Sequence, residues 1–235
     1  MSASDKIAEY LQRPFNRAVR EFNLIEDGDR IAVGVSGGKD SRVLLELLLR
    51  GVNIQGAYEV VAVHIEGTDV GLPDQRPSLE PWFRALGVEY EIAPLAVAAN
   101  EPLPMNCFRC SWNRRKALFF AADRWGCNKV ALGHHADDAA VTTLLNVLYQ
   151  GRAESLVPHR TFFEGRFIVI RPLIYVEECA ISRYARARGW EFPPELECPR
   201  IAASRRTKVV EFLRSLNKRE YERVRANLWR LGSEV

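Results

Sequence analysis

SGGKDS, residues 36–41, is the stretch that decides the fold. The apolar residues 31–35 lead directly into it and the leucine-rich residues 43–49 lead out of it, a pattern typical of a strand, a turn and a helix. Two adjacent glycines leave backbone N–H groups unobstructed, so these groups can converge on phosphate oxygens at the positive end of the helix. A tight turn without a ligand needs neither the lysine nor the two hydroxyl groups. The stretch therefore predicts a phosphate-binding turn at the carboxyl end of a strand.

Short apolar runs alternate with helical patterns after this turn. Most of the runs are nearly continuous in apolar character, as in strands that are buried on both faces. The predicted strands are residues 30–36, 59–66, 88–93, 129–134 and 166–173, and the predicted helices between them are residues 41–50, 113–125 and 137–150. This alternation predicts the α/β class with a doubly wound parallel sheet.

Helical patterns alone flank the predicted sheet on both sides. An amphipathic helix is predicted at residues 4–22, and helices at residues 176–188, 203–216 and 219–231 follow the last strand. We therefore expect three parts: an N-terminal helix within residues 1–28, a nucleotide-binding domain at residues 29–173 and a C-terminal helical extension at residues 174–235.

Composition and charge restrict the class of protein. The chain has 235 residues, of which 47% are apolar and 27% charged, as expected of one large globular domain. No stretch resembles a signal peptide and none reaches the roughly 20 apolar residues of a membrane span, so we expect a cytoplasmic protein without a membrane partner. The net charge is +3, but residues 151–235 alone carry +6. This basic tail favours a polyanionic partner, although solvated helical faces are a common alternative.

The turn can be compared with known phosphate loops. The motif G-x-x-x-x-G-K-[ST] does not fit, since the glycine spacing from Gly34 to Gly38 is one residue short, and G-x-G-x-x-G is absent. SGGKDS closely resembles the pyrophosphate loop (PP-loop) of the ATP pyrophosphatases, which form adenylates and release pyrophosphate. That resemblance implies a Rossmann-like PP-loop domain of the adenine nucleotide α-hydrolase type. It also implies that Asp40 lies near a magnesium ion in a catalytic role, and that the nucleotide is bound by Ser36, Gly37, Gly38, Lys39 and Ser41.

A second motif, GHHADD at residues 133–138, follows another predicted strand and should lie on the same edge of the sheet. Two aspartates in the first turn of a helix also favour its dipole without any further function. The string resembles the G-H-x-x-D-D signature of the same superfamily. The resemblance implies that Asp137 is the catalytic or magnesium-linked carboxylate, and that the nucleotide is contacted by Gly133, by His134 or His135, and by His64 in the second strand.

The five cysteines are Cys107, Cys110, Cys127, Cys179 and Cys198. An odd number without a secretion signal argues against a disulfide framework and favours metal binding, catalysis or burial. The C-x-x-C at residues 107–110 follows a loop late in the predicted sheet, unlike a thioredoxin motif, which opens a helix after the first strand. With Cys198, three thiolates suffice for a cubane iron–sulfur cluster with one open iron, whereas structural zinc normally takes four ligands. We expect Cys127 and Cys179 to be ordinary buried or half-buried thiols.

CFRCSWNRRKAL, residues 107–118, resembles the C-x-x-C-S-x-x-R-R-x-x-L stretch of the tRNA 2-thiocytidine synthetases, and FIVIRPL at residues 167–173 resembles the strand before their last helices. The similarity spans about residues 29–216. It implies a [4Fe-4S] cluster on Cys107, Cys110 and Cys198, and a catalytic Lys116 that steadies the adenylated intermediate. One departure is that the family's second distal C-x-x-C is reduced here to Cys198 alone.

The resemblance implies an ATP-dependent tRNA thiolase that uses ATP, Mg²⁺ and the cluster. It would adenylate a pyrimidine carbonyl and replace the oxygen with sulfur, with cytidine in the anticodon loop as the expected target. The implied partners are tRNA and a sulfide donor or cysteine desulfurase system; dimers are common in the family, and no sequence feature requires one. The RNA phosphates would be contacted by Arg114, Arg115, Arg205 and Arg206. The alternatives are a ligase of the lysidine type, a thiolase of another base or a small molecule, and an RNA- or nucleotide-binding module without turnover.

Overall fold

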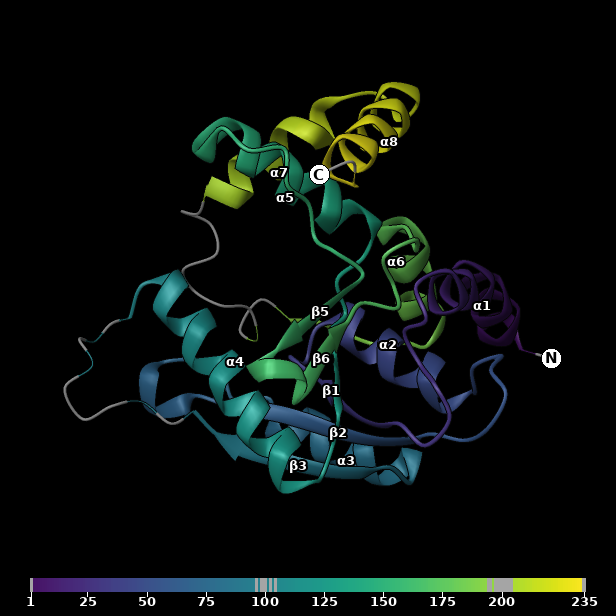
Figure 1. Ribbon diagram of the computed structural model, residues 1–235, viewed down its shortest axis with the longest axis vertical. Helices are drawn as coiled ribbons and strands as arrows, with labels where there is room; N and C mark the ends of the chain where they lie inside the picture. Colours follow the sequence, from purple (N-terminus) through teal and green to yellow (C-terminus); the bar gives the residue numbers. More distant parts are fainter. Residues whose placement is uncertain are drawn as a thin grey trace.

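The computed structural model describes residues 2–95, 97, 101, 103, 105–193, 196 and 205–233. One six-stranded sheet lies at its centre, in the order β3-β2-β1-β4-β6-β5 (Figure 1). The strands are β1 (Arg30–Gly34), β2 (Glu59–Glu66), β3 (Glu89–Pro94), β4 (Lys129–Ala131), β5 (His159–Phe162) and β6 (Phe167–Ile170). All neighbours are parallel except β5, which pairs antiparallel with β6 at the edge. The predicted α/β class with a parallel sheet is confirmed, except that the antiparallel edge strand β5 was not foreseen.

The helices of the described residues cover both faces of the sheet. They are α1 (Ala3–Glu21), α2 (Lys39–Leu49), α3 (Arg76–Leu86), α4 (Cys107–Arg124), α5 (Ala136–Gln150), α6 (Glu178–Ala187), α7 (Arg205–Ser215) and α8 (Lys218–Ser233), with short 3₁₀ turns at Thr68–Val70 and Phe163–Gly165. Two elements, α3 and β5, were not predicted from the sequence. The helix α4 begins at Cys107 and not at residue 113, so the C-x-x-C does open a helix, although after the third strand and not the first.

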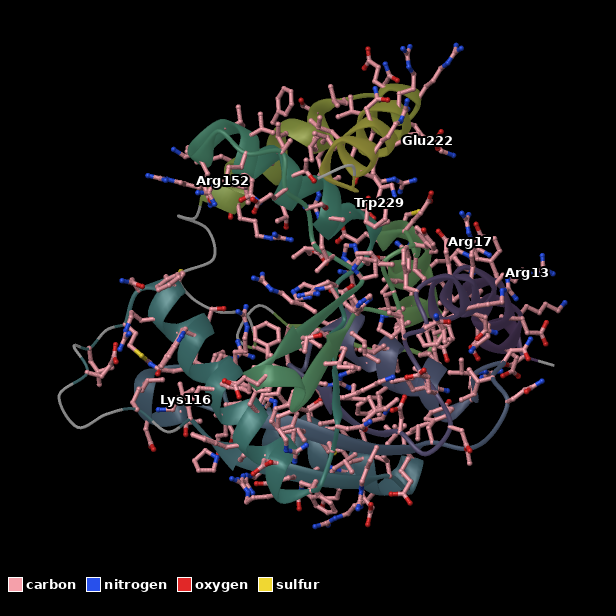
Figure 2. All side chains as sticks on the ribbon, in the orientation of Figure 1. Arg13, Arg17, Lys116, Arg152, Glu222 and Trp229 are labelled. Atoms are coloured by element: carbon pink, nitrogen blue, oxygen red, sulfur yellow. The ribbon has the colours of Figure 1, made fainter. Side chains whose placement is uncertain are left out.

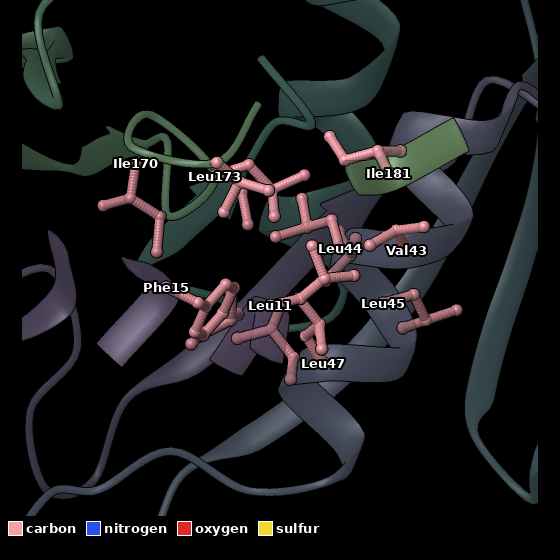
Figure 3. Packing of buried hydrophobic residues seen from close by; sticks show 14 of the residues in the cluster. Leu11, Phe15, Val43, Leu44, Leu45, Leu47, Ile170, Leu173 and Ile181 are labelled. Carbon is pink, nitrogen blue, oxygen red and sulfur yellow. The ribbon is translucent and has the colours of Figure 1, made fainter. Parts of the chain in front are cut away.

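The core has one layer on each face of the sheet, because alternate residues of a strand point to opposite faces. Ile31 and Val33 of β1 pack with α1, α2, α3 and α6, whereas Ala32 packs with α4 on the other face. Figure 3 shows the first layer, in which Leu11 and Phe15 of α1 meet the leucines of α2. The helices α1 and α6 therefore belong to the main core, and neither is an appendage.

The last two helices pack elsewhere. Val209 and Leu213 of α7 form a separate small cluster with Val141 of α5, and α8 packs along α5 as well. In Figure 1, α7 and α8 lie together with α5, away from the sheet. In the described part of the chain, no helix combines the length and apolar character that a membrane crossing requires.

Candidate active site

The SGGKDS turn connects the end of β1 to the start of α2. Gly37 has φ +94°, in the left-handed region that glycine adopts without strain. The Ser41 hydroxyl donates to the Gly38 carbonyl oxygen over 3.0 Å and accepts the Ser36 N–H over 3.1 Å, which closes the turn on itself. Gly38 is the N-cap of α2 and offers no side-chain cap. The N–H groups of the first turn of α2 are therefore available to an anion at the positive end of the helix dipole.

The second motif lies directly against this turn. A Cβ atom added at Gly133 would lie 3.0 Å from both the carbonyl carbon of Asp40 and the backbone nitrogen of Ser41. Only glycine permits this approach of two backbones. The strands β1 and β4 pair in parallel, with Val33 opposite Ala131, so both motifs leave the sheet at its carboxyl edge, as predicted.

His135 lies among three carboxylates. Its Nε2 is 3.7 Å from Oδ1 of Asp40 and 3.4 Å from Oδ2 of Asp138, and its Nδ1 is 3.5 Å from Oδ2 of Asp137. Burial opposes protonation of the imidazole, but the hydrogen bond to Asp137 and the charges of Asp138 and Asp40 outweigh it and raise the pKa of His135. The site therefore favours a cationic imidazole that holds the carboxylates together.

Lys39 extends this network toward α6. Its ammonium group lies 3.0 Å from Oδ1 of Asp40 and 3.1 Å from Oε1 of Glu178. Burial opposes the charge, but these two carboxylates raise the pKa of Lys39. The lysine of the turn is thus already ion-paired on the side of the C-terminal helices.

Asp137 is buried beneath the C-terminal helices. Its Oδ2 accepts the backbone N–H of Glu178 over 2.7 Å, and its Oδ1 accepts the hydroxyl of Tyr221 and lies 3.5 Å from the guanidinium of Arg225. Burial alone would raise the pKa of Asp137, but hydrogen bonds from His135 and Tyr221 hold it far below the usual range. Asp137 is therefore an anion held by four residues: His135, Glu178, Tyr221 and Arg225.

His134 faces the other side of the turn. Arg171 donates from Nε to Nδ1 of His134 over 3.3 Å, which leaves the ring proton on Nε2. Burial, with the nearby charges of Arg171 and Arg206, lowers the pKa of His134. The pKa values of these two neighbouring histidines are therefore shifted in opposite directions, down for His134 and up for His135.

A cavity of about 350 Å³ opens beside the turn, within the range of small-ligand sites. Apolar side chains of Val35, which follows β1, and of β2 and α4 form much of its lining. Its polar side chains come from residues far apart in the sequence: Ser36, Cys107, Cys110, Ser111, Arg114, Arg115 and His134. This one space thus contains part of each predicted set: Ser36 and His134, Cys107 and Cys110, and Arg114 and Arg115. A larger cavity of about 830 Å³ lies between the same turn and helices α6 to α8, and contains Asp40, His135 and Asp137 in its walls.

His64 is buried and borders the turn from β2. Its Nδ1 lies 2.7 Å from the carbonyl oxygen of Val35, so Nδ1 carries the proton and donates it. Burial is the main cause that lowers the pKa of His64. The ring also lines a small pocket that includes Ser36 and Arg114. This position beside the turn suits a residue that shapes the nucleotide site.

The carboxylates suit a magnesium ion that is shared with phosphates. In the described ranges, no three His, Cys, Asp or Glu side chains form a metal-binding group by themselves. Mg²⁺ bound with a nucleotide needs only one or two protein carboxylates, because phosphates and water complete its shell. The Oδ1 atom of Asp40 is buried, and the Lys39 ammonium lies 3.0 Å from it as an ion pair. A magnesium ion at this carboxylate would take the place of that ammonium.

Two of the three predicted cluster ligands are described. Cys107 is exposed and Cys110 is half-buried, one turn apart at the start of α4, where the Asn106 side chain caps the helix by accepting the Arg109 N–H over 2.9 Å. Soft thiol donors on one side of a cavity suit an iron–sulfur cluster. Cys198 lies outside the described residues.

The other two cysteines differ from each other. Cys127 is buried, and burial raises the pKa of its thiol to about 11, as expected of an inert thiol. Cys179 is exposed, which corrects the expectation of a buried or half-buried thiol, and its Sγ donates to Glu177 over 3.4 Å. Its place in the first turn of α6 keeps it in the wall of the larger cavity.

The structure does not bring Lys116 to either cavity. Its ammonium group lies 5.6 Å from the ring centres of Trp112 and Phe120, on the outer side of α4 (Figure 2). Arg205 stacks on the Tyr149 ring at 4.7 Å, and Arg206 pairs with Asp138. The predicted arginines therefore divide into a pair beside the smaller cavity and a pair on α7.

Sequence reasoning missed four residues that hold the site: Arg171, Glu178, Tyr221 and Arg225. A cation directly after a buried strand at Arg171 was a usable signal. The three tail residues carry none, because polar side chains on a helix ordinarily indicate a solvated face.

Comparisons with known proteins give a family match, curated relatives and a similar solved structure. A family described as a PP-loop domain matches residues 7–195. The tRNA-cytidine(32) 2-sulfurtransferase of Acidovorax ebreus is 35% identical over 238 aligned positions, covering 99% of this chain and 74% of the relative. That of Klebsiella pneumoniae is 36% identical over 224 positions, covering 92% and 70%. Among solved structures, the U34-tRNA thiolase NcsA from Methanococcus maripaludis with its [4Fe-4S] cluster has a TM-score of 0.77 and 21% identity, covering 98% of this chain and 80% of that one. That structural likeness shows a shared fold.

Proposed function

The chain belongs to the PP-loop family and to the tRNA-cytidine(32) 2-sulfurtransferases within it, and we propose on this basis that it replaces the 2-oxygen of a tRNA cytidine with sulfur at the cost of ATP. The observation that carries the proposal is the smaller cavity. Ser36 of the phosphate-binding turn, His134 and both described cysteines of the C-x-x-C line the same space. ATP activation and sulfur delivery would need this proximity.

Binding of ATP follows from the turn. The first-turn N–H groups of α2 and the left-handed Gly37 would receive the phosphates, and the Asp40 carboxylate would hold the magnesium ion in place of the Lys39 ammonium. The apolar wall formed by Val35, Val63 and Leu132 would cover the adenosine. Negative charge on the phosphates would be opposed by fixed dipoles that need no rearrangement.

The chemistry has two balanced steps. In the first, the cytosine 2-oxygen attacks the α-phosphorus, a new P–O bond forms, and pyrophosphate leaves with the electron pair of the broken bond. In the second, sulfide forms a bond to C2 and AMP leaves with the former base oxygen. A [4Fe-4S] cluster on Cys107, Cys110 and Cys198, when bound, would supply the site that holds the transferred sulfide.

The chain's own residues would orient these reactants. Arg114 and Arg115 line the cavity beside Ser36, so their guanidinium groups suit the phosphate of the adenylated base. His134 offers an Nε2–H, because Arg171 occupies its Nδ1. A donor of this kind can bind a phosphate or base oxygen without carrying charge. The proposed partners are tRNA and a sulfide donor, and a tRNA substrate suits the cytoplasm.

The test measures metal content and product together. Protein purified without oxygen should contain about four irons per chain with acid-labile sulfide, and should convert cytidine to 2-thiocytidine in tRNA with release of pyrophosphate. Cys107→Ser and Cys198→Ser should lose the cluster and the thiolation. Cys179→Ser, the matched control, should keep both.

Two results would contradict the proposal. Undiminished product formation in the Cys107→Ser and Cys198→Ser variants would favour an ATP-dependent ligase that needs no cluster. Zinc or no metal in anaerobic wild-type protein, together with no thiolated product, would remove the sulfur-transfer role and leave only the ATP site.

A further inference from the structure

The outer side of α4 carries an exposed row of large side chains. Phe108, Trp112, Lys116 and Phe120 are spaced four residues apart, which places them on one side of a helix. Phe108 is 76% exposed, Trp112 46% and Phe120 52%. Single exposed aromatics are common, but three in one row form a surface that needs an explanation.

Two cationic side chains, Lys116 and Arg109, lie close to the aromatic rings of the row. The Lys116 ammonium lies 5.6 Å from both ring centres that flank it, and the Arg109 guanidinium lies 5.5 Å from that of Trp112. Arg109 is neutralised by Glu101, at 2.9 Å from Nε to Oε1, but Lys116 has no carboxylate neighbour on α4, since residues 107–122 contain no Asp or Glu. The row therefore combines flat apolar faces with a lysine that has no acidic neighbour on its own helix.

The row lies beside the smaller cavity. Cys107, Cys110 and Ser111 line that cavity and alternate along the helix with Phe108 and Trp112 of the row. Phe108 and Trp112 are therefore next to residues that line the cavity, and Lys116 and Phe120 extend the row away from it along α4.

We propose that Phe108, Trp112, Lys116 and Phe120 form a stacking platform for unpaired nucleotides of an RNA loop that flank the nucleotide bound in the cavity. Bases stack on aromatic side chains whatever their sequence, and a lysine between the rings suits the phosphates that connect them. The positive charge of this side of α4 favours RNA over a second protein surface. The inference rests on the proposed function and gives Lys116 a role in RNA binding.

The test is the affinity for a fluorescent RNA stem-loop, measured by anisotropy at two salt concentrations. Trp112→Ala and Phe120→Ala should each weaken binding about five- to fifty-fold, the effect of losing one stacked base. Trp112→Phe should restore most of the affinity. Lys116→Gln should reduce the slope of log affinity against log salt by about one. A blunt RNA duplex should bind wild type and variants alike.

Tyr10→Ala is the matched control. Tyr10 is 56% exposed on α1 and also has a cation, Arg183, over its ring. The helix α1 lies on the other side of the molecule from α4 (Figure 1). The affinity of the Tyr10→Ala variant for the RNA stem-loop should stay within about twofold of wild type, as expected of a change outside the interface. Circular dichroism and thermal unfolding should be the same for all variants.

The outcomes separate the two proposals. If wild-type protein binds the stem-loop and the row variants bind equally well, the stacking platform is wrong and the proposed function stands. If wild-type protein binds no RNA, the proposed function fails, and the platform with it. If sedimentation shows that Trp112→Ala changes the mass of the free protein, the row is a contact between copies and the proposal is overturned.

Discussion

The missing side chain of Gly133 sets the distance between the two motifs of the site. A Cβ atom at position 133 would lie 3.0 Å from the carbonyl carbon of Asp40 and from the backbone nitrogen of Ser41, so Gly133→Ala must displace one backbone against the other. We expect a loss of about 1–3 kcal/mol in the free energy of unfolding, typical of overpacking, together with weaker ATP binding. Urea unfolding and calorimetric titration with ATP measure the two effects.

Gly38→Ala is the contrasting variant. Gly38 has φ −74°, and an added Cβ would meet only the Ser36 hydroxyl at 3.6 Å. The free energy of unfolding should therefore fall less with Gly38→Ala than with Gly133→Ala. The added methyl group should still weaken ATP binding, because it would obstruct phosphates in the turn. Equal stability losses in the two variants would show that the contact between the motifs is not tight.

His64 gives a pH dependence at the residue scale. Its folded-state pKa lies below the ordinary value of 6.5, mainly because of burial, with Arg114 contributing and Glu66 and Asp74 opposing. The unfolded chain then binds the proton more readily, so the free energy of unfolding falls as pH decreases below about 6.5. Wild-type protein should lose stability relative to His64→Asn between pH 7 and pH 5, by at most about 1.4 kcal/mol per pH unit. Parallel stability curves would contradict this.

At the scale of elements, α8 completes the surroundings of Asp137. Tyr221→Phe removes the hydroxyl that donates to this buried carboxylate and keeps the ring. Hydrogen bonds to charged groups contribute about 1.5–3 kcal/mol, and we expect a loss of that size with slower release of pyrophosphate from ATP. Denaturant unfolding and a pyrophosphate assay measure both.

Tyr149→Phe is the control for this variant, since Tyr149 is 45% exposed on α5 and its ring supports Arg205 from outside the site. Both readouts should stay near wild type. If Tyr221→Phe and Tyr149→Phe show the same free energy of unfolding and the same rate of pyrophosphate release, the hydrogen bond from α8 to Asp137 contributes nothing to either.

The elements that sequence patterns predicted well are those with a strong physical signature. Buried strands such as β1 and the glycine turn after it follow from apolar runs and backbone freedom. The helix α3 was missed because Pro77 and Pro81 interrupt its sequence, although proline is tolerated in a first turn. The strand β5 was missed because its residues are mostly exposed and lack apolar alternation. The contacts of Tyr221 and Arg225 depend on how α8 packs on α5, which no local pattern encodes.

At the scale of the whole molecule, the charge of the tail suits RNA, but its arginines are not equivalent. Arg205 is exposed and its guanidinium lies over the Tyr149 ring, whereas Arg206 pairs with Asp138. Arg205→Ala should weaken binding to different tRNAs by the same factor and reduce the salt slope by about one. Arg206→Ala should change the salt slope less. Filter binding across a salt series tests both, and the opposite order of effects would contradict the assignment.

The contact of α8 with Asp137 also has a consequence for synthesis. Asp137 leaves the ribosome well before Tyr221 and Arg225, and its buried anion has neither partner until α8 has emerged and packed on α5. A chain that has been synthesised only as far as α6 therefore has Asp137 without the Tyr221 hydroxyl and the Arg225 guanidinium. We expect the surroundings of this buried carboxylate to be completed only after α8 has been made and has packed on α5.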